Sequence, residues 1–179
     1  MNTKLEQYKA LSQPIVWGAV ENCFTLEAQV DESFVSNISI IPTVGDRYAV
    51  IQLEDGRWEL AGGTLEPGEH HMDALVREVK EELGAELKSY TRIGCFKCRS
   101  SAPEPYRPHI PHPSFIRLVG YGEIEIVGKP LNPPDGEQIA AVDVVDINEA
   151  VRRFEAIGRH DIAELYLLAH RLRQAEGRI

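Results

Sequence analysis

The chain has 179 residues, of which 43% are apolar and 26% charged, and its formal net charge is −9. This length suffices for one sizeable hydrophobic core, so we expect a single globular domain over residues 1–179, with residues 1–35 as an N-terminal extension or extra strands. The negative charge repels phosphate polymers and argues against a nucleic-acid polymer or an anionic membrane as a partner.

The sequence also predicts a cytoplasmic protein. No apolar run approaches the roughly 20 residues that a membrane-spanning helix needs, and the start of the chain lacks the apolar core of a signal peptide. The three cysteines are an odd number and do not make a disulfide framework, which fits a reducing compartment.

The first part of the chain is predicted to form strands. A short strand is expected at residues 15–18. The β-branched run at residues 36–41 and the sequence RYAVIQL at residues 47–53 are typical of strands, and the turn residues between them predict a hairpin connection. A short strand at residues 57–60 then leads into a glycine pair at residues 62–63, which we expect to form a turn.

A helix is predicted after this turn. Its apolar residues recur at helical spacing, so one stripe is expected to face a core: Met72, Leu75, Val76, Val79 and Leu83. Gly84 follows where a left-handed C-cap is expected.

Strands and helices are predicted to alternate in the rest of the chain. Residues 99–113 carry five prolines and are expected to form no regular element, because proline can neither donate to a strand ladder nor continue a helix. The other segments are predicted as strands at residues 88–98, 114–127 and 141–146 and as helices at residues 148–157 and 161–174.

The predicted acidic helix concentrates carboxylates. On a helix, residues three and four apart are neighbours, so Glu78, Glu81 and Glu82 converge on one face and repel one another. A cation among them would relieve the repulsion, and a set of oxygen ligands selects Mg²⁺ or Mn²⁺. Arg77 and Glu69 are positioned to hold these carboxylates in fixed rotamers. The competing interpretation is an ordinary solvated helix face.

The full spacing from residue 63 to residue 85 resembles the Nudix box, G-x5-E-x7-R-E-U-x-E-E-x-G-U, the signature of the Nudix hydrolases. The resemblance implies an α/β fold: a Nudix-type α/β/α sandwich with a mixed central sheet, a strand-loop-helix at the box and C-terminal helices. It implies a metal-dependent hydrolase that cleaves the pyrophosphate bond of a nucleoside diphosphate linked to another moiety, with Mg²⁺ or Mn²⁺ as cofactor.

The resemblance also implies residue roles. Glu78, Glu81 and Glu82 match the metal-binding glutamates, and the carbonyl of Gly62 or Gly63 matches the backbone ligand. Two further residues, Arg77 and Glu69, match the supporting pair. Glutamates of the box or of a later loop act as the general base in this family. The loop candidate here is Glu137.

Two histidines depart from the usual pattern. His70 and His71 stand at the start of the box helix, where many members have a serine or threonine cap followed by proline, and histidine caps poorly. We interpret both as surface residues without a role, with a contact to substrate phosphate as the alternative.

The substrate is left open between a nucleoside triphosphate and a nucleotide sugar. Residues 99–113 supply candidate substrate-binding side chains, unless the segment is only a proline-stiffened surface loop or a dimer contact: Arg99, Tyr106, Arg107, His109 and His112. The alternative function is a non-catalytic Nudix-fold sensor or scaffold that binds a nucleotide, and the family also allows a homodimer.

Overall fold

The computed structural model describes residues 4–27 and 29–179. Short elements open the chain, and they are the 3-10 helix η1 (Leu5–Gln7), the strands β1 (Ile15–Trp17) and β2 (Val20–Thr25), and the 3-10 helix η2 (Glu32–Phe34). The following elements are β3 (Val35–Val44), β4 (Arg47–Leu53), β5 (Trp58–Glu59), β6 (Ala61–Thr64), α1 (His71–Leu83), β7 (Ala85–Leu87), β8 (Thr91–Ser100), β9 (Ser114–Ile126), β10 (Ile139–Val145), α2 (Ile147–Ala156) and α3 (His160–Ala175).

The strands form a mixed sheet in the order β1-β2-β8-β9-β3-β4-β10, to which β5, β6 and β7 add by pairing with β4, β3 and β9. β3 and β9 run parallel, and the other pairs are antiparallel. β3 and β4 form the predicted hairpin, but they pair only at Thr43 and Val44, because residues 37–40 of β3 pair with β6 instead.

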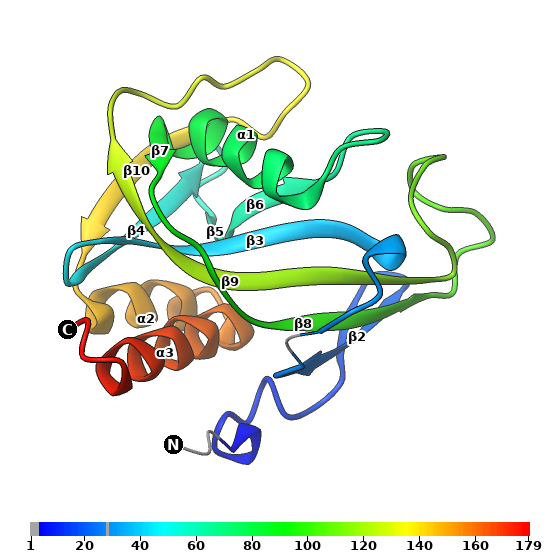
Figure 1. Ribbon diagram of the computed structural model, residues 1–179, viewed down its shortest axis with the longest axis horizontal. Coiled ribbons are helices and arrows are strands. Elements are labelled where there is room, and N and C mark those ends of the chain that lie inside the picture. The colour runs from blue at the N-terminus through cyan, green and yellow to red at the C-terminus, as the bar shows by residue number, and fades with distance from the viewer. Residues whose placement is uncertain (1–3, 28) are drawn as a thin grey trace.

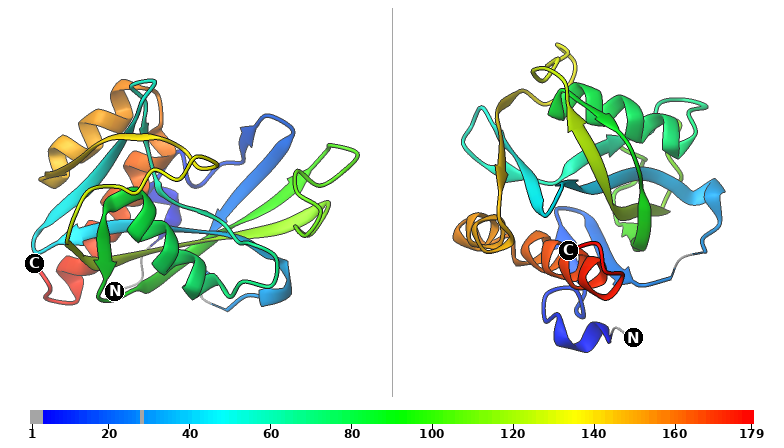
Figure 2. Two further views of the ribbon diagram at one scale, coloured as in Figure 1. Left: turned by 90° about the horizontal axis from the view of Figure 1, so that it is seen from above. Right: turned by 60° about the vertical axis from the view of Figure 1, so that its left-hand side comes forward.

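The sheet lies between helices. α1 covers one face, and α2 and α3 cover the other, as Figure 1 and the right-hand view of Figure 2 show. This arrangement confirms the predicted α/β/α sandwich. Within the described residues, none of the helices has the length and apolar character required to cross a bilayer.

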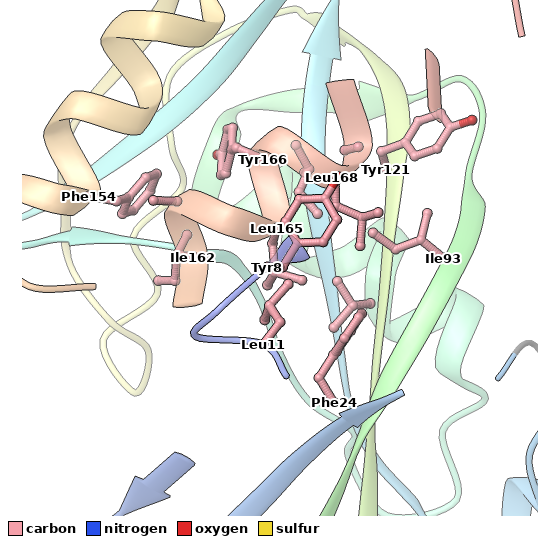
Figure 3. Close-up of a cluster of buried hydrophobic side chains, with 14 of the residues drawn as sticks. Tyr8, Leu11, Phe24, Ile93, Tyr121, Phe154, Ile162, Leu165, Tyr166 and Leu168 are labelled. Atoms are coloured by element: carbon pink, nitrogen blue, oxygen red, sulfur yellow. The ribbon is translucent and has the colours of Figure 1, made fainter. Parts of the chain in front are cut away.

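Each face of the sheet has its own hydrophobic core. Ile38 and Ile40 of β3 pack with α1 residues in one core, whereas Ile41 belongs to the core beneath α3. Figure 3 shows this second core, in which Leu165 and Leu168 of α3 meet residues of the sheet. Because β3 is buried on both faces, Ile40 and Ile41 are adjacent in the sequence yet belong to different cores.

Helix α1 follows its sequence pattern with one exception. It ends at Gly84, whose φ of 60° is left-handed as predicted. Leu75, Val79 and Leu83 are buried, but Val76 is 51% exposed, so its assignment to the buried stripe was wrong. Residue 76 lies one position past Leu75 and therefore turns about 100° away from it.

The glycine pair was predicted as a turn and instead lies in strand β6, where Gly62 pairs with Ser39 and Gly63 with Ile38. The strand predicted at residues 88–98 corresponds to β8, which begins at Thr91, and the short strand β7 precedes it without having been predicted. Residues 101–113 contain no helix or strand, as predicted.

Candidate active site

A cleft of about 630 Å³ opens beside α1 and β6. It extends past the loop before β10 to β8, β9, β1 and the start of α3, so segments far apart in the sequence share one cavity. Eight of the side chains and glycines singled out from the sequence line it: Gly62, Gly63, Arg77, Glu78, Glu81, Glu82, Arg107 and Glu137.

The two glycines allow close packing at the base of the cleft. A Cβ at Gly62 would lie 2.2 Å from the Ile38 carbonyl oxygen, and the φ of Gly62 is 138°, in a region that L residues rarely adopt. A Cβ at Gly63 would lie 2.0 Å from Oε1 of Glu78. Glycine is therefore required at residue 62 by the backbone of the neighbouring strand, whereas a side chain at residue 63 would displace the Glu78 carboxylate.

Arg77 organises the carboxylates of α1. Its Nε and Nη2 donate to the two oxygens of Glu69 at 2.9 and 3.0 Å, and its Nη1 donates to Glu78 at 2.8 Å and to Glu81 at 3.3 Å. Nη2 also donates to the Thr64 carbonyl at 3.2 Å. The bidentate pairing fixes the guanidinium plane, which in turn holds two carboxylates at the cleft.

Glu69 supports this arrangement from outside the cleft. Its Oε2 accepts a hydrogen bond from the Glu66 backbone N–H at 2.8 Å, which closes the turn before α1. Hydrogen bonding to Arg77 lowers the pKa of Glu69, so this carboxyl stays ionised. The loop and the helix are therefore connected through one ion pair.

Glu82 is the most deeply placed of the three box glutamates. It is 7% exposed, and its Oε2 accepts a hydrogen bond from the Gly62 N–H at 2.8 Å. Burial raises its pKa well above the usual value, and the charges of Glu78 and Glu137 add to the effect. Burial also raises the pKa of Glu78, although Arg77 opposes that shift.

Glu137 reaches the cleft from the loop between β9 and β10. Desolvation of its carboxyl and the nearby charge of Glu59 raise its pKa. A carboxylate with a raised pKa accepts a proton more readily near neutral pH, which is the property a general base needs.

The charge of the cleft fits a bound cation. Four arginines line it against eight acidic side chains: Glu59, Glu66, Glu78, Glu81, Glu82, Asp135, Glu137 and Asp161. Arg77 and the Gly62 N–H engage one oxygen of each box glutamate, which leaves each a second oxygen for a metal. A donor set made only of oxygens suits Mg²⁺ or Mn²⁺.

The proline-rich segment docks beside the cleft instead of lying in it. The Tyr106 hydroxyl lies 2.7 Å from Thr64 Oγ1, and His109 Nε2 lies 2.7 Å from the Leu65 carbonyl oxygen. Both contacts connect the segment to residues 64–65, at the end of β6. Among its candidate substrate-binding residues only Arg107 lines the cleft, and Arg99, Tyr106, His109 and His112 lie outside the lining.

The sequence interpretation missed the far end of the cleft. Trp17, Arg117, Arg159 and Asp161 line it there. They come from β1, β9 and α3 and share no motif, so only the pairing of the strands brings them together. The predicted strand at residues 114–127 includes Arg117, but alternation along a strand does not tell which face a given side chain shares with the site.

The two histidines at the start of α1 were interpreted as surface residues without a role, and the structure corrects this in part: His70 is exposed but caps the helix, and His71 is buried. His70 Nδ1 accepts a hydrogen bond from the Met72 N–H at 3.2 Å and so caps the helix. His71 is only 7% exposed, and its Nε2 lies 3.2 Å from Nη2 of Arg92. Across residues 4–27 and 29–179, His70, His71 and Glu32 form the one group of three whose ligand atoms lie within 4.8 Å of one another.

That group is satisfied without a metal. An arginine can only donate, so Nε2 of His71 accepts and its Nδ1 carries the proton. By the same reasoning His70 is protonated on Nε2. These two N–H groups face Oε2 of Glu32 at 3.4 and 3.7 Å. A metal bound to Nε2 of His70 and Nδ1 of His71 would displace their protons. The opposite ring nitrogens would then carry the protons, although they already face the donors of Met72 and Arg92.

A family model and several curated proteins match this chain. The family model described as NUDIX domain matches residues 37–166. The chain is 38% identical over 61 residues to YtkD of Bacillus subtilis (strain 168), a putative 8-oxo-dGTP diphosphatase, covering 34% of this chain and 39% of YtkD. It is 59% identical over 32 residues to the nucleoside triphosphatase NudI of Escherichia fergusonii, covering 18% of this chain and 23% of NudI. The matches thus span less than half the length of these curated relatives.

The fold has matches among solved structures. A mutant form of the Bacillus subtilis pyrophosphohydrolase BsRppH superposes with a TM-score of 0.54 and 22% identity over 70% of this chain and 71% of that one. This likeness shows the fold. Because the family model covers more than two thirds of the sequence, the chain belongs to the NUDIX hydrolase family.

Proposed function

We propose that this protein is a divalent-metal-dependent pyrophosphohydrolase that cleaves a nucleoside triphosphate. One observation carries the proposal: Arg77 and the Gly62 N–H hold Glu78, Glu81 and Glu82 at one wall of a single cleft, with the second oxygen of each carboxylate left for a cation. A non-catalytic sensor would have no need of such a surplus of fixed negative charge.

The chain's own residues take distinct roles in this proposal. Glu78, Glu81 and Glu82 hold the metal, together with the carbonyl of Gly62 or Gly63. Arg77 positions two of these carboxylates through its pairing with Glu69. When bound, Mg²⁺ or Mn²⁺ supplies charge neutralisation for the phosphate oxygens and acidity for a bound water.

Glu137 is assigned the role of general base, which accepts a proton from the attacking water. Its carboxyl lines the cleft with a raised pKa, whereas Glu81 is engaged by Arg77. Arg107 lines the same cleft and has no ion pair within the described residues, so its guanidinium is available to a substrate phosphate. The triphosphate is preferred to the nucleotide sugar because the NudI match is named a nucleoside triphosphatase.

The test is a substrate panel with product analysis. The purified protein is stripped of metal with EDTA and then supplied with Mg²⁺ or Mn²⁺ and with ATP, GTP, CTP, UTP, ADP-ribose or UDP-glucose. We expect metal-dependent release of a nucleotide product from at least one triphosphate, at a rate above that from either nucleotide sugar.

A matched control is available near the site. Replacing the cleft residue Glu82 by Gln should abolish turnover, and Glu86→Gln is the control for it. Glu86 is exposed in β7 and does not line the cleft, so its variant loses the same charge elsewhere. We expect Glu86→Gln to retain full turnover. Absence of cleavage of every compound, combined with a higher melting temperature in the presence of one of them, would favour the non-catalytic binder and contradict the proposal.

A further inference from the structure

Trp17, Phe96 and Arg117, here called the aromatic wall, close the end of the cleft that lies away from the three box glutamates. The ring centroids of Trp17 and Phe96 are 5.2 Å apart with an interplanar angle of 61°. The guanidinium carbon of Arg117 lies 4.9 Å from the Trp17 ring centroid. All three side chains line the cleft. Trp17 lies in β1, outside residues 37–166 that match the family model, whereas Phe96 and Arg117 lie inside them.

The N-terminal segment holds Trp17 firmly. The Leu11 N–H donates to Oε2 of Glu164 on α3 at 2.9 Å. The side chain of Asn22, which is fully buried, donates to the carbonyls of Ile15 and Val20 at 3.2 and 3.0 Å and so ties β1 to β2. The backbone that carries Trp17 is therefore held in place before any ligand arrives, which lowers the ordering cost when one binds.

Arg117 is available to a ligand. The other arginine at this end, Arg159, pairs with both oxygens of Asp161 at 3.0 Å and also contacts Glu59. Within the described residues Arg117 has no such carboxylate partner, and its guanidinium contacts the Trp17 ring. Its N–H groups can donate to an acceptor on a ligand that stacks on the indole.

The strand register sets the distance between the two ends. Gly62 pairs with Ser39 of β3, and Ser39 pairs with Val119 of β9, two residues from Arg117. Two strand spacings of about 4.8 Å put Val119 roughly 10 Å from Gly62. A ribose with its first phosphates bridges such a gap when extended. The box glutamates are thus placed for the phosphate end of a nucleotide, and the aromatic wall is placed for its base.

We infer that Trp17 and Arg117 form the nucleobase subsite, with the base stacked on the indole and guanidinium and the phosphates directed toward Glu78 and Glu82. The inference rests on the proposed function and deepens it. It requires a substrate with an aromatic base and excludes base-free polyphosphates as good substrates. Tyr106 was predicted to bind substrate, but it does not line the cleft and its hydroxyl lies 2.7 Å from Thr64 Oγ1, so the stacking role is assigned to Trp17.

The first experiment is kinetic. Alanine substitution of a stacking aromatic typically weakens binding of a base by about 10- to 100-fold. Trp17→Ala should therefore raise the KM for the best triphosphate by about that factor with little change in kcat. The inhibition constant of inorganic tripolyphosphate, which has no base, should stay the same. Trp17→Tyr should restore most of the affinity.

The control is Val16→Ala. Val16 is the neighbouring residue on β1, is 67% exposed and does not line the cleft. It should leave KM unchanged. A loss of affinity for tripolyphosphate equal to that for the nucleotide would show that Trp17→Ala distorts the whole cleft, and an unchanged KM would show that the base binds elsewhere. Either result would overturn the inference.

The second experiment does not depend on hydrolysis. The chain has two tryptophans, and Trp58 is outside the cleft lining, so Trp58→Phe leaves Trp17 as the sole tryptophan. A nucleotide should quench its fluorescence and tripolyphosphate should not. Quenching without turnover would retain the subsite and refute the enzyme. Turnover without quenching would refute the subsite and retain the enzyme.

Discussion

The two polar clusters of helix α1 differ in charge balance. At its N-terminus, His70 and His71 each accept one hydrogen bond and present one N–H to Glu32, so donors match acceptors. In the cleft, one arginine serves several glutamates, and burial raises the pKa of both Glu78 and Glu82.

The two clusters differ in how a bound cation would affect them. Closeness of ligand atoms selects the histidine cluster, but there a metal would break hydrogen bonds that are already made. Surplus buried charge selects the cleft, where a cation would remove the part of the desolvation penalty that Arg77 and the Gly62 N–H leave. Unbalanced charge is therefore the better guide to function here, and three substitutions test this view.

The largest effect is expected from Glu82→Gln. Loss of a metal ligand should lower metal-dependent turnover by at least about 100-fold, since a bound metal supplies several kcal/mol to the transition state. The metal-free variant should also be more stable at pH 7–8, by roughly 1 kcal/mol or about 2–4 °C in melting temperature. The amide keeps the shape and can still accept from the Gly62 N–H, but it buries no charge.

The sign follows from the pKa of Glu82. Because burial raises it, the folded protein holds the proton more tightly than the unfolded chain does. The wild-type protein therefore recovers stability as the pH falls through the raised pKa, and the advantage of the Gln variant shrinks. Calorimetry in EDTA from pH 8 to pH 5 measures this. A Gln variant that is less stable at every pH would contradict the charge-surplus view.

Arg77→Lys should have an intermediate effect. A single ammonium cannot form the bidentate pair with Glu69 and also reach Glu78 and Glu81. Loss of a group that orients metal ligands typically reduces metal affinity or activity by about 10- to 100-fold. We expect the Mg²⁺ concentration for half-maximal rate to rise, as measured by metal titration. An unchanged titration curve would show that Arg77 does not position the ligands.

His71→Gln should have the smallest effect. We expect turnover and metal dependence within about twofold of wild type, because the histidine cluster holds the helix start and takes no part in the chemistry. Burial lowers the pKa of His71, although Glu32 opposes that shift and the positive charge of Arg92 adds to it.

The pH dependence of stability provides the measurement for this variant. Because the pKa of His71 is lowered only in the folded protein, the unfolded chain takes up the proton first as the pH falls. The stabilisation is therefore present above the ordinary histidine pKa and is lost as the pH falls below about 6.5. The variant should lose less stability than wild type between pH 7 and pH 5, followed by thermal melts. A large loss of activity would instead place this cluster in the catalytic machinery.

Local patterns were sufficient for much of the fold. The β-branched run at residues 36–41, the amphipathic helix and its C-cap at Gly84 depend on short-range propensity and periodicity, and the structure contains all three. Errors occurred where long-range pairing overrides local preference. Gly62 and Gly63 belong to a strand because β3 pairs with them, and His71 is buried by segments from elsewhere in the chain.

The site divides in the same way. The carboxylates and the arginine that holds them could be predicted from local spacing, because a helix brings residues three and four apart to one face. The residues opposite them depend on how distant segments pair in the fold. Glu137 was a candidate through the family resemblance, but Trp17 and Arg117 were not predicted, because strand order and register, which no local pattern encodes, bring them to the cleft.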